Sequence, residues 1–312
     1  MTNVSMQPRP RLTTGALVQD GPVLLATKPF NGLDAPLAVA RWLAAREERA
    51  LRVVSVLEPT EGVVVAGVPP LPSRYYADER TALAAQIRSE IAVADAGPGS
   101  LRVDVLEGQS AQTIVDAARE CGARVIVVGT GRHDPLGRYL YGERALQILG
   151  RADRPVLIVP RDAVAAPLAV AVVAVDFSPA SVRAAHAVLP LLAPGGRLIV
   201  VHVKTGVTLK EETAGWWNDA YERRCADLFA QFLRQLPQMP DVTFESKFLR
   251  GDIVPKVLDY AAAQGARLIA CGRLGHSLVE RVFVGSVSSA LVRHATCPVL
   301  IAPELPGDVA WH

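Results

Sequence analysis

The sequence is poor in several residue types and patterns that mark particular classes of protein. Aromatic residues make up 5% of the 312 residues, and the four cysteines lie far apart without a CxxC pair. Such spacing fits neither a zinc site nor a disulfide framework, and it favours a reducing compartment. There is no run of eighteen apolar residues and no apolar segment at the N-terminus, so we expect neither a membrane span nor a secretion signal. We therefore expect a cytoplasmic protein.

An excess of charge of one sign is also missing. The 33 Lys and Arg residues nearly balance 31 Asp and Glu residues, which leaves a net charge of +2, and the basic residues are scattered along the chain. Binding to nucleic acid or to an anionic membrane surface relies on concentrated positive charge. We therefore predict no nucleic-acid partner and no membrane partner.

What the chain has instead is an internal repeat. The segment Leu106–Pro160 aligns on Leu249–Pro303 without a gap, with glycines at matching positions and a Pro-Val-Leu-Ile run near each end. Further upstream, Val23–Thr27 aligns on Val172–Asp176 if a small difference in length is allowed. Duplication explains this match far better than chance. We expect two domains, at 12–163 and 167–304.

Each copy alternates short apolar runs rich in Val and Ile with helical patterns, which is typical of βα units and a buried parallel sheet. We therefore predict an α/β fold of two tandem, doubly wound domains, each with a five-stranded parallel sheet. A helix is expected over Ser181–Leu192, ended by Pro194-Gly195-Gly196. The expected strands are Val23–Ala26, Arg52–Leu57, Arg102–Leu106, Val125–Val128 and Val156–Val159, and then Ala169–Val175, Arg197–His202, Val242–Leu249, Arg267–Cys271 and Val299–Ala302.

Ligands of such open sheets bind at the carboxyl ends of the strands. In the second copy Asp176 follows the first strand and His202-Val203 ends the second, so they should converge at this edge. Asp176 could contact a ligand, could cap the helix that begins near Pro179, or could do both. We expect His202 to be hydrogen-bonded within the fold rather than catalytic.

A glycine-spaced loop follows the fourth strand of the second copy. It reads Gly272-Arg-Leu-Gly275, nine residues, then Gly285-Ser286, and it leads into a helical segment. Glycines let the backbone approach a ligand, and N–H groups at a helix start favour an anion such as phosphate. The same glycines could instead serve only as turn and cap residues. Cys271, just before the loop, reads as a small buried residue rather than a redox thiol.

These residues resemble the universal stress protein family in its tandem two-domain form. The resemblance rests on the glycine loop, on Asp176-Phe-Ser, on His202-Val203 and on the ending Cys297-Pro-Val-Leu-Ile. It implies Rossmann-like domains of the adenine nucleotide alpha hydrolase-like kind, joined antiparallel through their last strands. Here Val156–Val159 would pair with Val299–Ala302 and make the chain an intrachain pseudo-dimer. Whether two chains form a homodimer stays open.

The resemblance also implies a ligand: ATP, with or without Mg²⁺, or another adenine nucleotide, bound by the second domain. Asp176 and the backbone around Val203 would contact the adenosine part. The loop glycines would pass beside the ribose and phosphates, and the helix start would hold phosphate oxygens. His276 could approach phosphate or be a solvated loop histidine, and Arg281 could neutralise phosphate or lie on an exposed helix face. The implied nucleotide-binding residues are Asp176, Val203, Gly272, Gly275, Gly285, Ser286 and Val287.

The first copy departs from this pattern. In the alignment Thr27 stands at the position of Asp176, Arg132 replaces the second glycine, and Glu143 replaces Ser286. A carboxylate at the phosphate position repels the ligand. We predict that the first domain keeps the fold and binds ATP weakly or not at all. An Arg132–Glu143 ion pair that fills the space is a hypothesis.

The sequence offers little for catalysis. No Walker lysine follows the glycines, and no Ser-His-Asp or metal-ligand spacing is present, so we predict no catalytic residue and no metal site in the protein itself. The leading interpretation is a nucleotide-binding regulatory module of the stress response. Two alternatives stay open: a ligand-free interaction scaffold of the same fold, and a slow ATPase.

Overall fold

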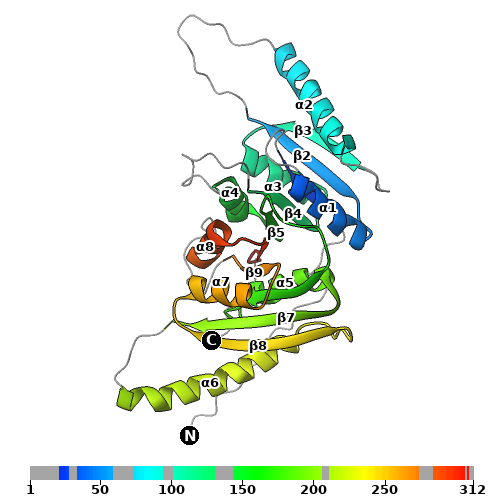
Figure 1. Ribbon diagram of the computed structural model, residues 1–312. Coiled ribbons are helices and arrows are strands. Elements are labelled where there is room, and N and C mark those ends of the chain that lie inside the picture. Colours follow the sequence, from blue (N-terminus) through cyan, green and yellow to red (C-terminus); the bar gives the residue numbers. More distant parts are fainter. Residues whose placement is uncertain are drawn as a thin grey trace, which may run out of the picture.

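The computed structural model describes residues 21–27, 34–58, 73–93, 101–130, 143–205, 211–273, 284–305 and 308. Ten strands form one sheet, and helices cover both of its faces (Figure 1). The first half contains β1 (Val23–Ala26), α1 (Asp34–Arg46), β2 (Leu51–Leu57), α2 (Ser73–Val93), β3 (Leu101–Glu107), α3 (Ser110–Glu120), β4 (Val125–Gly129), α4 (Glu143–Arg151) and β5 (Val156–Val159). The second half contains β6 (Leu168–Ala174), α5 (Pro179–Val188), the 3₁₀-helix η2 (Leu189–Leu191), β7 (Leu192–Lys204), α6 (Glu211–Leu233), β8 (Val242–Arg250), α7 (Ile253–Ala263), β9 (Ile269–Gly272), α8 (Ser286–His294) and β10 (Val299–Ala302).

The two halves have the same topology. The strand order is β3-β2-β1-β4-β5-β10-β9-β6-β7-β8, so β6 to β10 repeat the arrangement of β1 to β5 in reverse. All pairings within each half are parallel. Because crossover helices cover both faces of a parallel sheet, its central strands read as continuous apolar runs. The predicted fold of two tandem α/β domains is confirmed.

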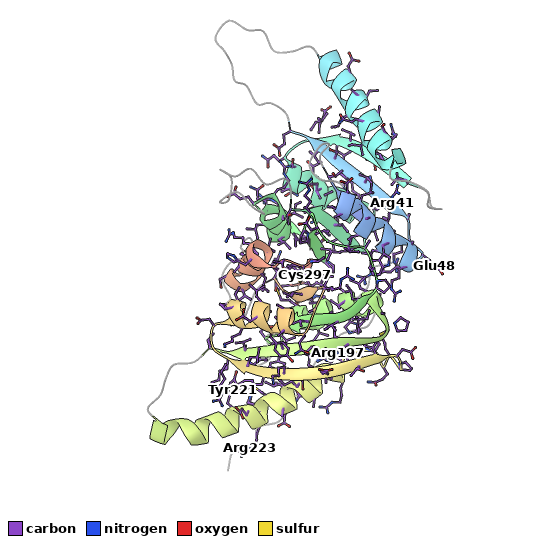
Figure 2. All side chains as sticks on the ribbon, in the orientation of Figure 1. Arg41, Glu48, Arg197, Tyr221, Arg223 and Cys297 are labelled. Carbon is purple, nitrogen blue, oxygen red and sulfur yellow. The ribbon has the colours of Figure 1, made fainter. Side chains whose placement is uncertain are left out.

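The halves are joined by their last strands. β5 and β10 pair antiparallel, with Val299 opposite Ile158, Leu300 opposite Leu157 and Ile301 opposite Val156. This is the predicted intrachain pairing, and it covers two strand edges that would otherwise be open. Figure 2 labels Cys297, two residues before β10, near the middle of the molecule where the halves meet.

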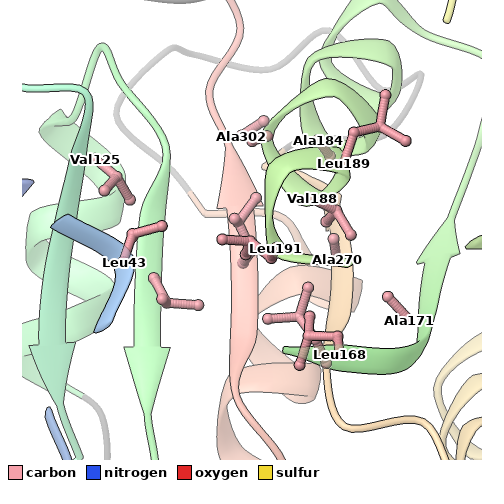
Figure 3. Packing of buried hydrophobic residues seen from close by; sticks show 14 of the residues in the cluster. Leu43, Val125, Leu168, Ala171, Ala184, Val188, Leu189, Leu191, Ala270 and Ala302 are labelled. Carbon is pink, nitrogen blue, oxygen red and sulfur yellow. The ribbon is translucent and has the colours of Figure 1, made fainter. Parts of the chain in front are cut away.

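The core has two layers, one on each face of the sheet. On one face the strands pack against α1, α2, α5 and α6, and on the other against α3, α4, α7 and α8. The first layer runs without a break from Leu43 and Val125 in the first half to Leu191 and Ala270 in the second (Figure 3). The two halves therefore share their hydrophobic core. Among the described helices none is long and apolar enough to cross a membrane.

The predicted helix Ser181–Leu192 is wrong at both ends. The helix α5 already begins at Pro179, and it passes through η2 into β7 at Leu192. Pro194-Gly195-Gly196 lies inside β7, where the pairing with β6 shifts register. Gly195 has a φ of +75° and its N–H donates to Asp241 O at 2.7 Å. The Pro-Gly-Gly run forms an irregularity in a strand. The same residues are typical of the end of a helix, so the sequence alone does not distinguish the two.

The strand register also corrects the alignment of Thr27 with Asp176. Ala26 pairs with Val128, and Ala174 pairs with Cys271. Because Val128 and Cys271 are equivalent in the gap-free part of the repeat, Thr27 is the counterpart of residue 175 and not of Asp176. The alignment is wrong by one residue because short runs of Val, Leu and Ala carry no internal marker. The counterpart of Asp176 is Lys28, which lies outside the described residues.

Candidate functional site

A pocket of about 440 Å³ lies at the carboxyl ends of β6, β7 and β9 in the second half. Its size is within the range of sites that hold small organic ligands. Six of the predicted binding residues line it: Asp176, Val203, Gly272, Gly285, Ser286 and Val287. The remaining predictions, Gly275, His276 and Arg281, lie outside the described residues. Residues from three separate segments of the chain thus converge on one pocket, at the edge where the topology predicts a site.

Asp176 is braced by the first turn of α5. Its Oδ1 accepts the Ser178 N–H at 3.1 Å and the Ser181 hydroxyl. Ser178, and not Asp176, is the N-cap of α5, because its Oγ accepts the Ser181 N–H at 3.3 Å. Phe177 between them has a φ of +63°, a backbone conformation that costs a non-glycine residue about 1–3 kcal/mol. This local structure holds the carboxylate of Asp176 at the pocket wall.

Both ring nitrogens of His202 have hydrogen-bond partners within the fold. Its Nδ1 lies 2.8 Å from Val175 O, which can only accept, so Nδ1 carries the proton. Its Nε2 lies 3.0 Å from the hydroxyl of Tyr221, which therefore donates to it in the neutral ring. The prediction of a hydrogen-bonded histidine is confirmed.

Tyr221 itself was not predicted from sequence. It lies on α6 (Figure 2) and lines the pocket. Burial, with a smaller contribution from Cys225, raises the pKa of Tyr221 to about 12, so the phenol keeps its proton at neutral pH. Because α6 lies in the variable segment after the second strand of the copy, no motif identifies this tyrosine.

Lys204 adds a positive charge to the pocket. It ends β7 directly after Val203, and its Nζ lies 4.2 Å from the ring centroid of Tyr221. This is the geometry of a cation–π contact. The N–H of Gly251 donates to Lys204 O as that of Gly108 donates to Leu57 O, so the first half has a leucine at the equivalent place. In the sequence Lys204 directly follows His202-Val203, so it could have been predicted to line the same site.

Gly272 has a packing role that does not depend on a ligand. A Cβ at this position would lie 3.0 Å from Ala180 Cβ and 3.4 Å from Ser181 N, at the start of α5. At the equivalent Gly129 a Cβ would lie 2.8 Å from Pro36 Cγ, at the start of α1. Both halves therefore need this glycine where a strand end passes under a helix, and it does not distinguish a binding domain from a non-binding one.

The start of α8 forms another part of the pocket wall. Gly285 is its N-cap, and Ser286 and Val287 are its first helical residues. The Gly285 N–H and the buried Ser288 hydroxyl both donate to Arg273 O, at 3.0 Å and 2.7 Å. First-turn N–H groups of an α-helix have no partner within the helix, and this end carries a partial positive charge. The wall is suited to an anion.

The thiol of Cys271, which also lines the pocket, is unreactive. Burial, with smaller contributions from the charges of Asp176 and Glu304, raises the pKa of Cys271 far above its ordinary value. The thiol stays protonated. The side chain is buried, with 4% of its surface exposed, which confirms the prediction of a small buried residue. Within the described ranges, no group of three or more His, Cys, Asp and Glu residues gathers to hold a metal ion.

The equivalent place in the first half is built differently. Glu143 begins α4 where Ser286 begins α8. The next residue, Arg144, forms an ion pair with Glu58 after the end of β2, with 3.6 Å between Nη2 and Oε1. These are the positions of Val287 and Thr205, which line the pocket in the second half. The hypothetical pair of Glu143 with Arg132 involves a residue outside the described part of the chain.

Comparisons with known proteins agree with the duplicated fold. The universal stress protein family matches residues 22–160 and again residues 170–303. A universal stress protein of Mycolicibacterium smegmatis is 28% identical over 208 residues, which cover 65% of this chain and 68% of that protein. A relative from Staphylococcus haemolyticus is 52% identical over 58 residues, 18% of this chain, and the match spans about a third (34%) of the relative. The crystal structure of a universal stress protein from Archaeoglobus fulgidus, 19% identical, matches with a TM-score of 0.64 over 93% of this chain and 99% of its own.

Proposed function

Because the chain belongs to the universal stress protein family and carries two copies of its domain, we propose that it is a stress-response module whose second domain binds an adenine nucleotide, most directly ATP. The observation that carries this proposal is the pocket of about 440 Å³, which is lined both by Asp176 and by the start of α8. The carboxylate and the helix start lie on one pocket, as recognition of a nucleoside and of its phosphates requires.

The lining offers a partner for each part of the ligand. Asp176 accepts hydrogen bonds from the ribose or the base, and the backbone at Val203 lies beside the base. Val203, Ile253 and Val257 give the pocket an apolar wall against which a purine can pack. Gly272 and Gly275 let the chain pass beside the ribose, and Gly285, Ser286 and Val287 hold the phosphates at the helix start. Lys204 adds a positive charge, and in this proposal His276 and Arg281 reach the phosphates from the loop.

A magnesium ion would arrive with the nucleotide. Mg²⁺ in nucleotide sites binds phosphate oxygens, one or two carboxylates and water. Asp176 lies at the adenosine side in this arrangement, and the described residues hold no acidic cluster beside α8. The donors of the phosphate side are N–H and hydroxyl groups, so the protein recognises the phosphates directly and any ion is supplied by the ligand.

We propose sensing rather than turnover as the role of the bound nucleotide. Fast phosphoryl transfer needs a group that positions or activates the nucleophile. Both ring nitrogens of His202 are engaged, and the thiol of Cys271 is buried and protonated. The four cysteines are all free thiols, which supports a reducing compartment such as the cytoplasm for this module.

The first domain keeps the fold without the binding groups. Lys28, Glu143 and Leu57 stand where the second domain has Asp176, Ser286 and Lys204. A carboxylate at the phosphate wall repels a polyanion, and the pair of Arg144 and Glu58 occupies the positions of Val287 and Thr205, which line the pocket of the second domain. We therefore propose one nucleotide site per chain.

Isothermal titration of the full chain with ATP tests this proposal, together with mass spectrometry of any ligand released from the freshly denatured protein. We expect saturable binding of one ATP per chain and thermal stabilisation by ATP. If millimolar ATP gives neither heat nor stabilisation, the ligand-free scaffold is the better account. Phosphate release measured in the same samples distinguishes a slow ATPase from a sensor.

A further inference from the structure

One side chain of the glycine loop leaves its own half of the molecule. Arg273 follows Gly272 directly, and it is buried with 6% of its surface exposed. Its Nη1 donates to three carbonyl oxygens: Leu149 O at 3.0 Å, and Gly150 O and Ala152 O at 3.3 Å. Its Nε donates to Glu304 at 3.0 Å. The three carbonyls lie at the end of α4, in the first half.

The chemistry of this contact is specific to arginine. The last carbonyls of a helix lack partners within it and carry a partial negative charge. A guanidinium keeps its charge when buried and directs several donors in one plane, whereas an unpartnered buried charge would be strongly destabilising. The end of α4 and the carboxylate of Glu304 together satisfy Arg273. If α4 moved away from the loop, Nη1 of the buried Arg273 would lose these three acceptors.

The backbone of the same residue organises the phosphate wall. Arg273 O accepts the Gly285 N–H and the Ser288 hydroxyl at the start of α8. Its N–H donates to Ala302 O at 2.8 Å, at the end of β10, which is one of the two strands that join the halves. One residue therefore connects the wall of the pocket, the central pair of strands and the end of α4.

The counterpart of Arg273 in the first half does not make this connection. It is Thr130, whose N–H donates to Val159 O at 3.2 Å in the same way. A threonine side chain is too short to reach the end of a helix in the other half. The loop of the second domain is thus tied to the first domain by a side chain that the equivalent position of the first domain lacks.

We propose that Arg273 is a positioning residue that couples occupancy of the second-domain pocket to the packing of α4 in the first domain. This proposal rests on the proposed function. A phosphate held by the start of α8 fixes the turn around Arg273 O, and the guanidinium transmits that constraint to α4. Because coupling between sites is reciprocal, firm packing of α4 also favours nucleotide binding. The domain without a nucleotide site is then the part of the chain that responds to the nucleotide.

Hydrogen exchange of the full chain, with and without saturating ATP, tests the coupling. We expect ATP to slow exchange at two places: residues 284–292, at the start of α8, and residues 146–153, at the end of α4. Arg273→Thr, which copies the first half, should keep the first effect, lose the second, and weaken ATP binding about tenfold, within the usual range of such couplings. Arg273→Lys retains the charge with fewer donors and should show the same losses to a smaller degree.

Arg183→Met is the matched control. Arg183 is also buried and also donates to a backbone carbonyl, Pro303 O at 3.0 Å and 2.8 Å, and it pairs with Asp308 within its own half. This variant should lose stability and yet keep both exchange effects. If ATP slows exchange at α8 but not at α4 in the wild type, or equally at α4 in the Arg273 variants, the coupling is refuted while nucleotide binding stands. If ATP slows exchange at neither place and does not bind in titration, both proposals fail.

Discussion

The two halves of this chain have one topology and two different strand-end surfaces. β1 to β5 and β6 to β10 repeat the same order, and Gly129 and Gly272 end equivalent strands. At the helix starts beyond them the halves differ, with Glu143 on α4 and Ser286 on α8. The residues that build the fold are shared, and at the start of these helices the first half has a carboxylate where the second has a hydroxyl.

The comparison shows which positions of the glycine loop are needed for packing and which could serve binding. The first glycine of the loop is required in both halves because a strand end passes under a helix. Its presence therefore indicates the fold and says little about a ligand. The discriminating positions are those with a charge or a donor at the pocket wall, such as Asp176, Lys204 and Ser286.

The largest effect is expected from Ser286→Glu, which gives the second domain the residue of the first. A carboxylate beside the phosphates should weaken ATP binding about a hundredfold, because like charges placed together in an interface cost several kcal/mol. Ser286→Gln is the matched control, since it has a similar size without the charge. Titration calorimetry measures both. If the two variants bind ATP equally well, charge at this position does not explain the difference between the halves.

A smaller loss is expected from Asp176→Asn. The amide oxygen can still accept from Ser178 and Ser181, so the turn before α5 is retained, whereas the charged acceptor for the ligand is lost. ATP binding should weaken about tenfold, because hydrogen bonds to charged groups contribute about 1.5–3 kcal/mol. The melting temperature without ATP should stay near that of the wild type, and Asp176→Ala, which loses both contacts, should melt lower. Unchanged affinity in both variants would remove Asp176 from the site.

The free energy of unfolding should depend modestly on pH through His186, which lies where the two halves pack together. Burial, assisted by the positive charge of Arg124 in the other half and opposed by a hydrogen bond to Gln235 O, lowers the pKa of His186 below its ordinary value of about 6.5. The unfolded chain then takes up a proton at a higher pH than the folded chain does. The free energy of unfolding should therefore decline as the pH falls below about 6.5.

His186→Gln tests this dependence, because glutamine keeps an N–H donor for Gln235 O and does not titrate. Denaturant unfolding at a series of pH values should show a shallower decline for the variant between about pH 7 and 5, the range just above and below the ordinary histidine pKa. An equally steep decline in wild type and variant would assign the acid sensitivity to other groups.

The smallest effect is expected from the reverse change in the first domain. Glu143→Ser combined with Arg144→Val removes the carboxylate and the ion pair with Glu58, which is largely exposed and contributes little. We expect the stoichiometry to stay at one ATP per chain, because Lys28 and Leu57 still differ from the second domain. A second site created by these two changes would show that the first domain differs from a binding domain only at its helix start.

Much of the fold follows from the repeat and the apolar pattern alone. The expected strands Val23–Ala26, Val156–Val159 and Val299–Ala302 agree with the structure residue for residue, because each is a short buried run between clear turn residues. The end of α5 was misjudged because Pro194-Gly195-Gly196 is equally compatible with a helix stop and with an irregular strand. The offset at Thr27 has a similar cause, since the register becomes fixed only by pairing with β4.

The sequence predicts part of the pocket lining. It predicts residues at strand ends and helix starts, but not residues whose role depends on a contact with a distant part of the chain. Asp176, Val203, Gly285 and Ser286 stand at strand ends and helix starts, positions that the topology brings to one edge. Tyr221 comes from α6, whose packing against β8 is not encoded in any local pattern. The role of the Arg273 side chain depends on the end of α4, more than a hundred residues earlier in the chain, and no motif records such a contact.

Native mass spectrometry of the full chain titrated with ATP counts the ligands bound to each molecule. We expect a single bound ATP per chain at saturation, and its loss in Ser286→Glu. Two ATP molecules per chain, or one that persists in Ser286→Glu, would contradict the claim that two domains of one fold share a single working site.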